Sequence, residues 1–127
     1  MAAQSDAQIV AEAEDRIVGS VLLYPAGTVI ARPGGGSITL ASPEVRLLAV
    51  APSARGQGVG GTLMHECIRR ARRSGAPALT LHTIDIMEAA MRLYGRLSFR
   101  RAPELDFQPA PGVTIKGYRL GLEQTAS

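Results

Sequence analysis

Four glycines between a predicted strand and a predicted helix are the residues of this sequence best suited to chemistry. They lie in the run 52–62, which reads Pro-Ser-Ala-Arg-Gly-Gln-Gly-Val-Gly-Gly-Thr. Glycine adopts positive φ angles and lets the backbone approach an anion closely. The first amides of a helix have no partner within the helix, so they bind phosphate without any lysine. The run therefore predicts a site for the phosphates of a cofactor.

Two well-known phosphate-binding patterns fit this run poorly. A P-loop ends in Gly-Lys-Ser or Gly-Lys-Thr, whereas the corresponding residues here are Gly60, Gly61 and Thr62. A dinucleotide-binding fold has an acidic residue at the end of the next strand, about 20 residues further on. That strand ends here in Leu81-His82-Thr83, so both patterns are disfavoured.

A strand and a helix must position the glycine run. Glu44–Val50 is predicted to be a strand, which stops before Pro52 because proline cannot donate a hydrogen bond to a sheet. Beyond the glycines the apolar residues recur at helical spacing, and Gly75 suits the left-handed position that closes a helix. These apolar residues are Val59, Leu63, Met64, Cys67, Ile68 and Ala71.

The other predicted elements complete one mixed domain over residues 1–127. A hairpin precedes the central strand, and a second helix is expected to begin at a capping box formed by Asp85 and Glu88. The order of strands and helices predicts an α/β fold of the α+β type, a mixed sheet with helices packed on it. The remaining predicted strands are Gln8–Glu14, Ile17–Tyr24, Ser37–Leu40, Ala78–Thr83, Phe99–Arg101 and Ile115–Leu120, with loops over Pro25–Gly36 and between the last two strands.

Composition narrows the possible partners. The chain has 127 residues, 46% of them hydrophobic, with 14 Lys and Arg against 11 Asp and Glu. This excess suits an anionic ligand, while nucleic acid is disfavoured because no aromatic residues are interleaved with the arginines. Cys67 is the only cysteine, so we expect a core residue, no disulfide and no metal site. Without a signal peptide or a run of about 18 apolar residues, we expect a cytoplasmic protein without membrane contact.

Two segments resemble the GNAT family of N-acetyltransferases. The run 45–60 resembles the family's acetyl-CoA motif, Arg/Gln-x-x-Gly-x-Gly/Ala, which Arg55, Gly58 and Gly60 fill. Residues 90–99, which read Ala-Met-Arg-Leu-Tyr-Gly-Arg-Leu-Ser-Phe, resemble the family's Ala-x-x-Leu-Tyr-x-x-x-Gly-Phe segment. The resemblance extends over roughly residues 9–120, with its specific part at 45–99, and it implies the family's acyl-CoA N-acyltransferase fold.

The resemblance also implies where acetyl-CoA binds. The amides from Gln57 to Gly61 would bind its pyrophosphate, and the backbone of Leu48, Ala49 and Val50 would pair with the pantetheine arm as a strand pairs with its neighbour. The implied cofactor-binding residues are Leu48, Ala49, Val50, Arg55, Gly56, Gln57, Gly58, Val59, Gly60, Gly61 and Thr62.

Acetylation of an amine needs a base for the amine and a proton for the leaving thiolate, because an alkyl ammonium has a pKa of about 10.4. Tyr94 matches the family's general acid, although its spacing alone would place it in the core. Glu44 is the first candidate for the base, acting through a water. Period-two counting places it on the same face of its strand as Arg46, Leu48 and Val50. His82 is the second candidate.

The sequence departs from the family pattern at three places. Met87 stands where asparagine is frequent, and Ser98 replaces the glycine before Phe99. The chain also begins with the hairpin at Gln8, where the family usually has a strand and two helices that form part of the acceptor-binding wall. A truncated chain, a natural short form and a homodimer whose partner supplies the wall would each account for this.

These observations favour an N-acetyltransferase that transfers acetyl from acetyl-CoA to a primary amine of a small molecule, a peptide or a protein. A non-catalytic acyl-CoA-binding or regulatory module is the first alternative. A nucleic-acid-binding domain that uses the arginines between 69 and 73 is the second.

Overall fold

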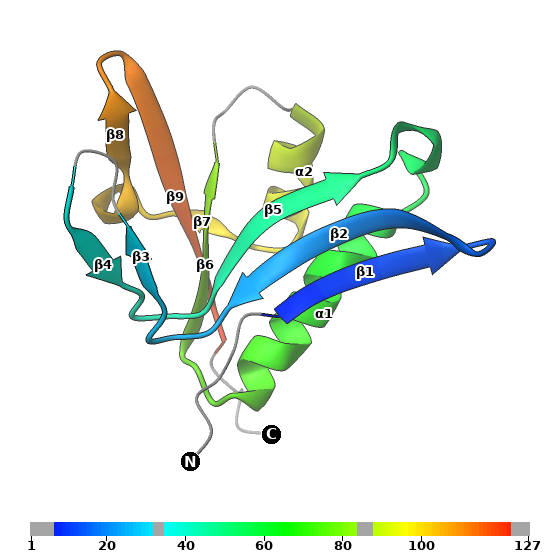
Figure 1. Cartoon of the computed structure of the whole chain (residues 1–127), viewed down its shortest axis with the longest axis horizontal. Coiled ribbons are helices and arrows are strands. Elements are labelled where there is room, and N and C mark those ends of the chain that lie inside the picture. Colours follow the sequence, from blue (N-terminus) through cyan, green and yellow to red (C-terminus); the bar gives the residue numbers. More distant parts are fainter. Residues whose placement is uncertain (1–6, 32–34, 84–87, 123–127) are drawn as a thin grey trace.

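A mixed sheet crossed on one face by a long helix organises the protein (Figure 1). The computed structural model describes residues 7–31, 35–83 and 88–122. Within them a seven-stranded sheet has the order β1-β2-β5-β6-β9-β7, with β8 paired to β9, and β3 and β4 form a separate hairpin. The predicted mixed sheet with helices packed on it is confirmed.

The bounds of the elements follow the chain. The strands are β1 (Ala7–Ala13), β2 (Arg16–Tyr24), β3 (Val29–Ala31), β4 (Ser37–Thr39), β5 (Glu44–Val50), β6 (Ala78–Thr83), β7 (Arg100–Arg101), β8 (Phe107–Ala110) and β9 (Val113–Gly121). The helices are α1 (Val59–Arg73) and α2 (Glu88–Arg96), with single 3-10 turns η1 (Pro52–Ala54) and η2 (Pro103–Leu105).

The two predicted loops contain strands that the sequence pattern missed. The loop prediction for Pro25–Gly36 is wrong at β3, and the loop prediction before Ile115 is wrong at η2 and β8. Strands of three or four residues are too short for a period of two to stand out, and Pro109 within β8 is tolerated because β8 lies at an edge of the sheet. The predicted helix start at Asp85 and the departure at Met87 lie outside the described residues.

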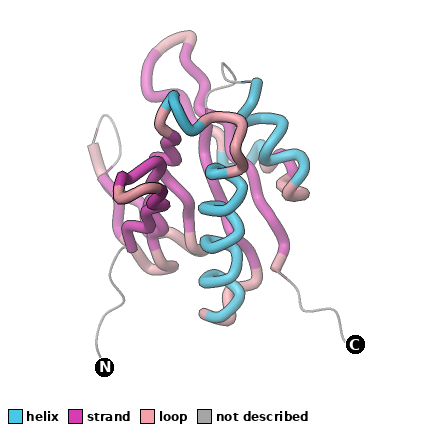
Figure 2. The backbone as a smooth tube through the Cα atoms, turned by 90° about the vertical axis from the view of Figure 1, so that its right-hand side faces the viewer, coloured by secondary structure: helices cyan, strands magenta, loops and turns pink. Residues whose placement is uncertain are grey.

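The buried face of α1 is the one that the sequence predicts. Leu63, Met64, Cys67, Ile68 and Ala71 are all buried, and they pack with the core residues of β1, β2, β5 and β6. Figure 2 shows this helix lengthwise against the strands. Burial raises the pKa of the Cys67 thiol to about 11, so this cysteine is a core residue as expected and a poor nucleophile.

Strand β5 pairs with the middle of β6 through its first two residues only. The parallel pairing joins Glu44 to Thr80 and Val45 to Leu81, and no later pair is made. In Figure 1 the two strands diverge from that point, and α2 stands between their separated ends. The rest of β5 therefore presents an edge without a strand partner on the side of β6.

Strand β5 also contains a β-bulge directly after Arg46. Leu47 and Leu48 together oppose one residue of β2, and Leu47 has a φ of 56° and a side chain that is 73% exposed. The extra residue reverses the alternation of the strand, so Leu48 packs against the core on the α1 side. Arg46 and Glu44 point to the opposite face. The prediction that Glu44 shares a face with Arg46 is therefore right, and the prediction that it shares this face with Leu48 and Val50 is wrong.

Candidate functional site

A groove of about 630 Å³ opens where β5 and β6 diverge. The second half of β5, the start of α1, the end of β6 and one face of α2 form its walls. The groove thus joins the predicted glycine run to the predicted Tyr94 segment. Its lining includes Arg46, Leu48, Ala49, Val50, Arg55, Gly56, Gly58, Val59, Gly60, Gly61, His82, Leu93 and Tyr94.

The start of α1 offers the groove a set of free amides. Gly58 is the N-cap residue with a φ of 81°, and no side chain caps the helix. The first bond of the helix runs from the amide of Thr62 to the carbonyl of Gly58, at 3.0 Å. The amides of Val59, Gly60 and Gly61 come before that bond and are left for a ligand. Because they stand at the positive end of the helix dipole, they suit an anion.

Two of the predicted cofactor-binding residues do not line the groove. Gln57 turns its side-chain amide to the carbonyl of Ser53, and the hydroxyl of Thr62 bonds to the carbonyl of Gly58. The amide of Thr62 is already used within the helix. The other nine predicted residues all line the groove, including Arg55 and the unpaired edge of β5.

Tyr94 reaches the same groove from α2. Its side chain is 8% exposed and packs edge to face against Phe99, with 6.0 Å between the ring centroids. Burial raises the pKa of the Tyr94 hydroxyl, so the phenol keeps its proton throughout the neutral range. Among the described residues no hydrogen bond occupies this hydroxyl, which leaves it available to a ligand.

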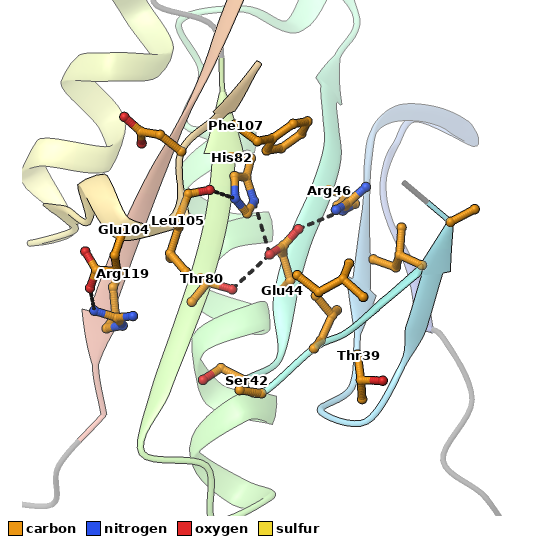
Figure 3. A pocket seen from close by; sticks show the side chains of 16 residues that line it. Thr39, Ser42, Glu44, Arg46, Thr80, His82, Glu104, Leu105, Phe107 and Arg119 are labelled. Carbon is orange, nitrogen blue, oxygen red and sulfur yellow. Dashed lines mark hydrogen bonds and ion pairs between the residues drawn. The ribbon is translucent and has the colours of Figure 1, made fainter. Parts of the chain in front are cut away.

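A second cavity, of about 420 Å³, lies on the sheet face opposite α1 (Figure 3). The β3–β4 hairpin, η2 and the start of β8 surround it, and Glu44 lies at its floor. We call it the hairpin pocket. Arg46 and His82 line both the groove and the hairpin pocket, whereas Tyr94 lines only the groove and Glu44 only the pocket. The two predicted catalytic residues thus do not share a cavity.

Glu44 is held by three partners in the floor of the hairpin pocket. It is 1% exposed, and Nε of Arg46 donates to it at 2.7 Å and the hydroxyl of Thr80 at 3.1 Å. Nδ1 of His82 lies 3.2 Å from its carboxylate, close enough for an ion pair although not aligned for a hydrogen bond. Burial alone would raise the pKa of Glu44, but His82 and Arg46 outweigh it and the pKa is lowered.

The surroundings of His82 favour the protonated form of its ring. Its Nε2 donates to the carbonyl of Leu105 at 2.9 Å while Nδ1 faces Glu44. Both ring nitrogens therefore face acceptor oxygens, which only the doubly protonated imidazole satisfies. Glu44 accordingly raises the pKa of His82 against the effect of burial.

Sequence reasoning missed Thr80 as a member of this cluster, and it placed Arg46 on the face of Glu44 without giving it a role. The available signal for Thr80 was its spacing, because it lies two residues from His82 on the neighbouring strand. Residues two apart in a strand share a face. The pairing of β5 with β6 then brings the four side chains together.

Replacing Glu44 by glutamine is expected to lower the free energy of unfolding by about 3 kcal/mol, because Arg46 and His82 lose their shared counter-charge at a buried position. The effect should depend on pH. Because the pKa of Glu44 is lower in the folded protein than its ordinary value of 4.5, its charge stabilises the fold at pH values above 4.5. This stability is lost as the pH falls through the lowered pKa. Because the pKa of His82 is higher in the folded protein than its ordinary value of 6.5, its protonation stabilises the fold at pH values below 6.5. This stability is lost as the pH rises through the raised pKa.

The difference in stability between the parent protein and Glu44→Gln should therefore be largest between about pH 4.5 and 6.5. Urea denaturation at pH 4, 5.5 and 8 measures it. Glu104→Gln is the matched control, because Glu104 bonds to Arg119 at the exposed surface and should contribute little. A difference that does not change with pH would contradict the ion pair.

Neither a membrane span nor a metal centre is found in the part of the chain that the structure describes. None of its helices is long and apolar enough to cross a membrane. The same residues contain no group of three His, Cys, Asp or Glu side chains placed to hold a metal ion.

Comparisons with known proteins agree with this geometry. An uncharacterised N-acetyltransferase of Schizosaccharomyces pombe is 31% identical over 87 residues, which are 68% of this chain and 52% of that protein. The chain thus spans about half the length of this curated relative. Residues 2–99 match the sequence model of the acetyltransferase (GNAT) family.

Solved structures show the same fold. A GNAT-family acetyltransferase of Desulfovibrio desulfuricans superposes with a TM-score of 0.71 at 22% identity, over 93% of this chain and 69% of that one. The ribosomal-protein-alanine N-acetyltransferase of Brucella melitensis superposes with a TM-score of 0.67 at 25% identity, over 91% of this chain and 68% of that one. Since the family match covers most of its residues, this protein belongs to the acetyltransferase (GNAT) family.

Proposed function

We propose that this protein is an N-acetyltransferase that transfers the acetyl group of acetyl-CoA to a primary amine of a small molecule, a peptide or a protein. The observation that carries the proposal is the groove itself. It combines free helix amides, an unpaired strand edge and a buried phenol at one place. An elongated, phosphorylated thioester needs these three features in this order.

The cofactor would lie along the groove with its pyrophosphate at the start of α1. The free amides of Val59, Gly60 and Gly61 would donate to the phosphate oxygens, and Arg55 would add positive charge at the exposed end. The amides of the pantetheine arm would pair with the unpaired edge of β5 from Leu48 to Val50. The thioester then reaches the end of the groove that Tyr94 lines.

In the reaction the amine nitrogen attacks the thioester carbonyl carbon and the carbon–sulfur bond of the adduct breaks. Tyr94 would donate its proton to the leaving sulfur, which has the pKa of an ordinary thiol, about 8.5. The raised pKa of Tyr94 keeps this proton in place until the sulfur becomes charged. Glu44 would take the proton of the amine through a water that passes Arg46 and His82, the two residues common to both cavities.

A non-catalytic acyl-CoA-binding module remains the alternative function. It is favoured by the separation of Glu44 from Tyr94, because the candidate base and the candidate acid line different cavities. The lowered pKa of Glu44 also makes it a weak base.

A thiol-release assay distinguishes the two functions. Purified protein is incubated with acetyl-CoA and a panel of primary amines, and acetyl-CoA binding is measured by calorimetry on the same sample. We expect micromolar binding and amine-dependent release of CoA. Binding without turnover over the whole panel would favour the module, and absence of binding would exclude both functions.

A further inference from the structure

Arg46 stands at the junction of the groove and the hairpin pocket. Its Nε donates to Glu44 and its guanidinium lies over the ring of Tyr24, 5.8 Å from the ring centroid. The terminal nitrogens Nη1 and Nη2 have no hydrogen-bond partner among the described residues, and the side chain is 33% exposed. An arginine held on one side, with its fork free on the other, suits a planar anion.

Basic side chains outnumber acidic ones at the floor of the hairpin pocket. Arg46 and His82 share the single carboxylate of Glu44, so the floor has one positive charge in excess when His82 is protonated. The other charged residues of the lining do not balance this excess, because they are already paired. Arg119 bonds to Glu104 and Asp106 bonds to Arg101, both at 2.8 Å. One negative charge on a ligand would complete the cluster.

The walls of the hairpin pocket are largely apolar. Ile38, Leu40, Leu105 and Phe107 line it above the charged floor. A ligand for this pocket therefore combines an apolar body with one anionic group. The anionic group would lie at Arg46, beside the place where the groove delivers the thioester.

We infer that the acceptor is an α-amino acid with an apolar side chain, its carboxylate held by the free fork of Arg46 and its side chain in the hairpin pocket. This inference rests on the proposed acetyl transfer. A guanidinium binds a carboxylate through two parallel hydrogen bonds, and in an α-amino acid the amine is one carbon away from that carboxylate. The amine is thus brought to the point where the two cavities meet.

Matched acceptors test the role of the carboxylate. L-leucine, L-leucinamide and 3-methylbutylamine share a side chain but carry a carboxylate, an amide and nothing at the same carbon. We expect kcat/KM for leucine to exceed the other two by at least tenfold, with each value referred to the concentration of free amine, because the alkyl ammonium of 3-methylbutylamine is the least acidic of the three. Leucinamide has a more acidic ammonium than leucine and hence more free amine at neutral pH, and the same reference corrects for this.

Variants of two arginines test the role of Arg46. With kcat/KM referred to free amine, Arg46→Gln should reduce the ratio for leucine over 3-methylbutylamine to about one, mainly through KM. Arg46→Lys should give an intermediate ratio because it keeps the charge without the fork. Arg69→Gln is the control, because Arg69 is exposed on α1, bonds to Glu66 and lines neither cavity, so the variant should leave the ratio unchanged.

Calorimetric titration of leucine and leucinamide into the CoA-saturated protein separates this inference from the proposed function. Binding of leucine that Arg46→Gln abolishes, without acetyl transfer, would support the carboxylate site and contradict the transferase. Equal binding of leucine and leucinamide, or turnover of amines without preference for the carboxylate, would overturn the site and leave the transferase standing. Thermal denaturation confirms that each variant is folded before these outcomes are read.

Discussion

Replacing Tyr94 by phenylalanine is expected to lower kcat for acetyl transfer by about 100-fold or more, the usual contribution of a positioned general acid, while the Kd for acetyl-CoA changes by less than about twofold. The change removes only the hydroxyl. The ring keeps its buried position and its contact with Phe99, so folding and the shape of the groove are retained. Steady-state kinetics and calorimetry on the same preparations measure the two quantities.

Tyr118→Phe is the matched control for this variant. Tyr118 is a comparably buried tyrosine on β9 that does not line the groove, so its replacement should leave kcat unchanged. The parent enzyme should also keep its activity up to about pH 10, because burial raises the pKa of Tyr94 above the ordinary tyrosine value. Full activity of Tyr94→Phe with intact cofactor binding would contradict the role of Tyr94 as the general acid.

Gly60→Val should weaken acetyl-CoA binding by at least tenfold without unfolding the protein. A Cβ on Gly60 would lie 3.3 Å from Cδ2 of Leu93 and 3.7 Å from Cγ2 of Val50, in the path of a ligand that reaches the helix amides. Loss of one hydrogen bond to a charged group costs about 1.5 to 3 kcal/mol, which corresponds to at least a tenfold change in affinity. Valine is a better helix former than glycine, so the melting temperature should not fall far.

Thr62→Val introduces the same side chain two residues further along α1. Thr62 does not line the groove, and the change removes only its hydroxyl bond to the carbonyl of Gly58, so acetyl-CoA binding should stay within about twofold of the parent. Calorimetry and thermal denaturation of both variants give the comparison. Parent-like acetyl-CoA affinity in Gly60→Val would show that the phosphates bind elsewhere.

The side of the groove formed by β5 and the start of α1 could be predicted from the sequence because its determinants are local. A strand, a glycine run and a helix follow one another within residues 44–73, and the free amides are a property of the first helical turn. Which amides of this turn are free could not be predicted from the glycine spacing. The structure shows it, because the hydrogen bond from the amide of Thr62 to the carbonyl of Gly58 marks where bonding within the helix begins.

The hairpin pocket could not be predicted because its determinants are distant in sequence. The cluster around Glu44 depends on the register that places Glu44 beside Thr80, 36 residues away. It also depends on the bulge at Leu47, where a residue other than glycine adopts a φ of 56°. No local sequence pattern predicts that conformation. Period-two counting through the bulge therefore assigned Leu48 and Val50 to the wrong face of the strand.

Because of the bulge, the two halves of β5 contribute to two different cavities, the hairpin pocket and the groove. Before the bulge, the side chains of Glu44 and Arg46 line the hairpin pocket. After it, the same strand packs Leu48 on the core and presents its backbone edge to the groove. Substitutions at the residues of the first half that face the pocket are therefore expected to leave in place the backbone edge beyond Leu47, along which the cofactor is proposed to lie.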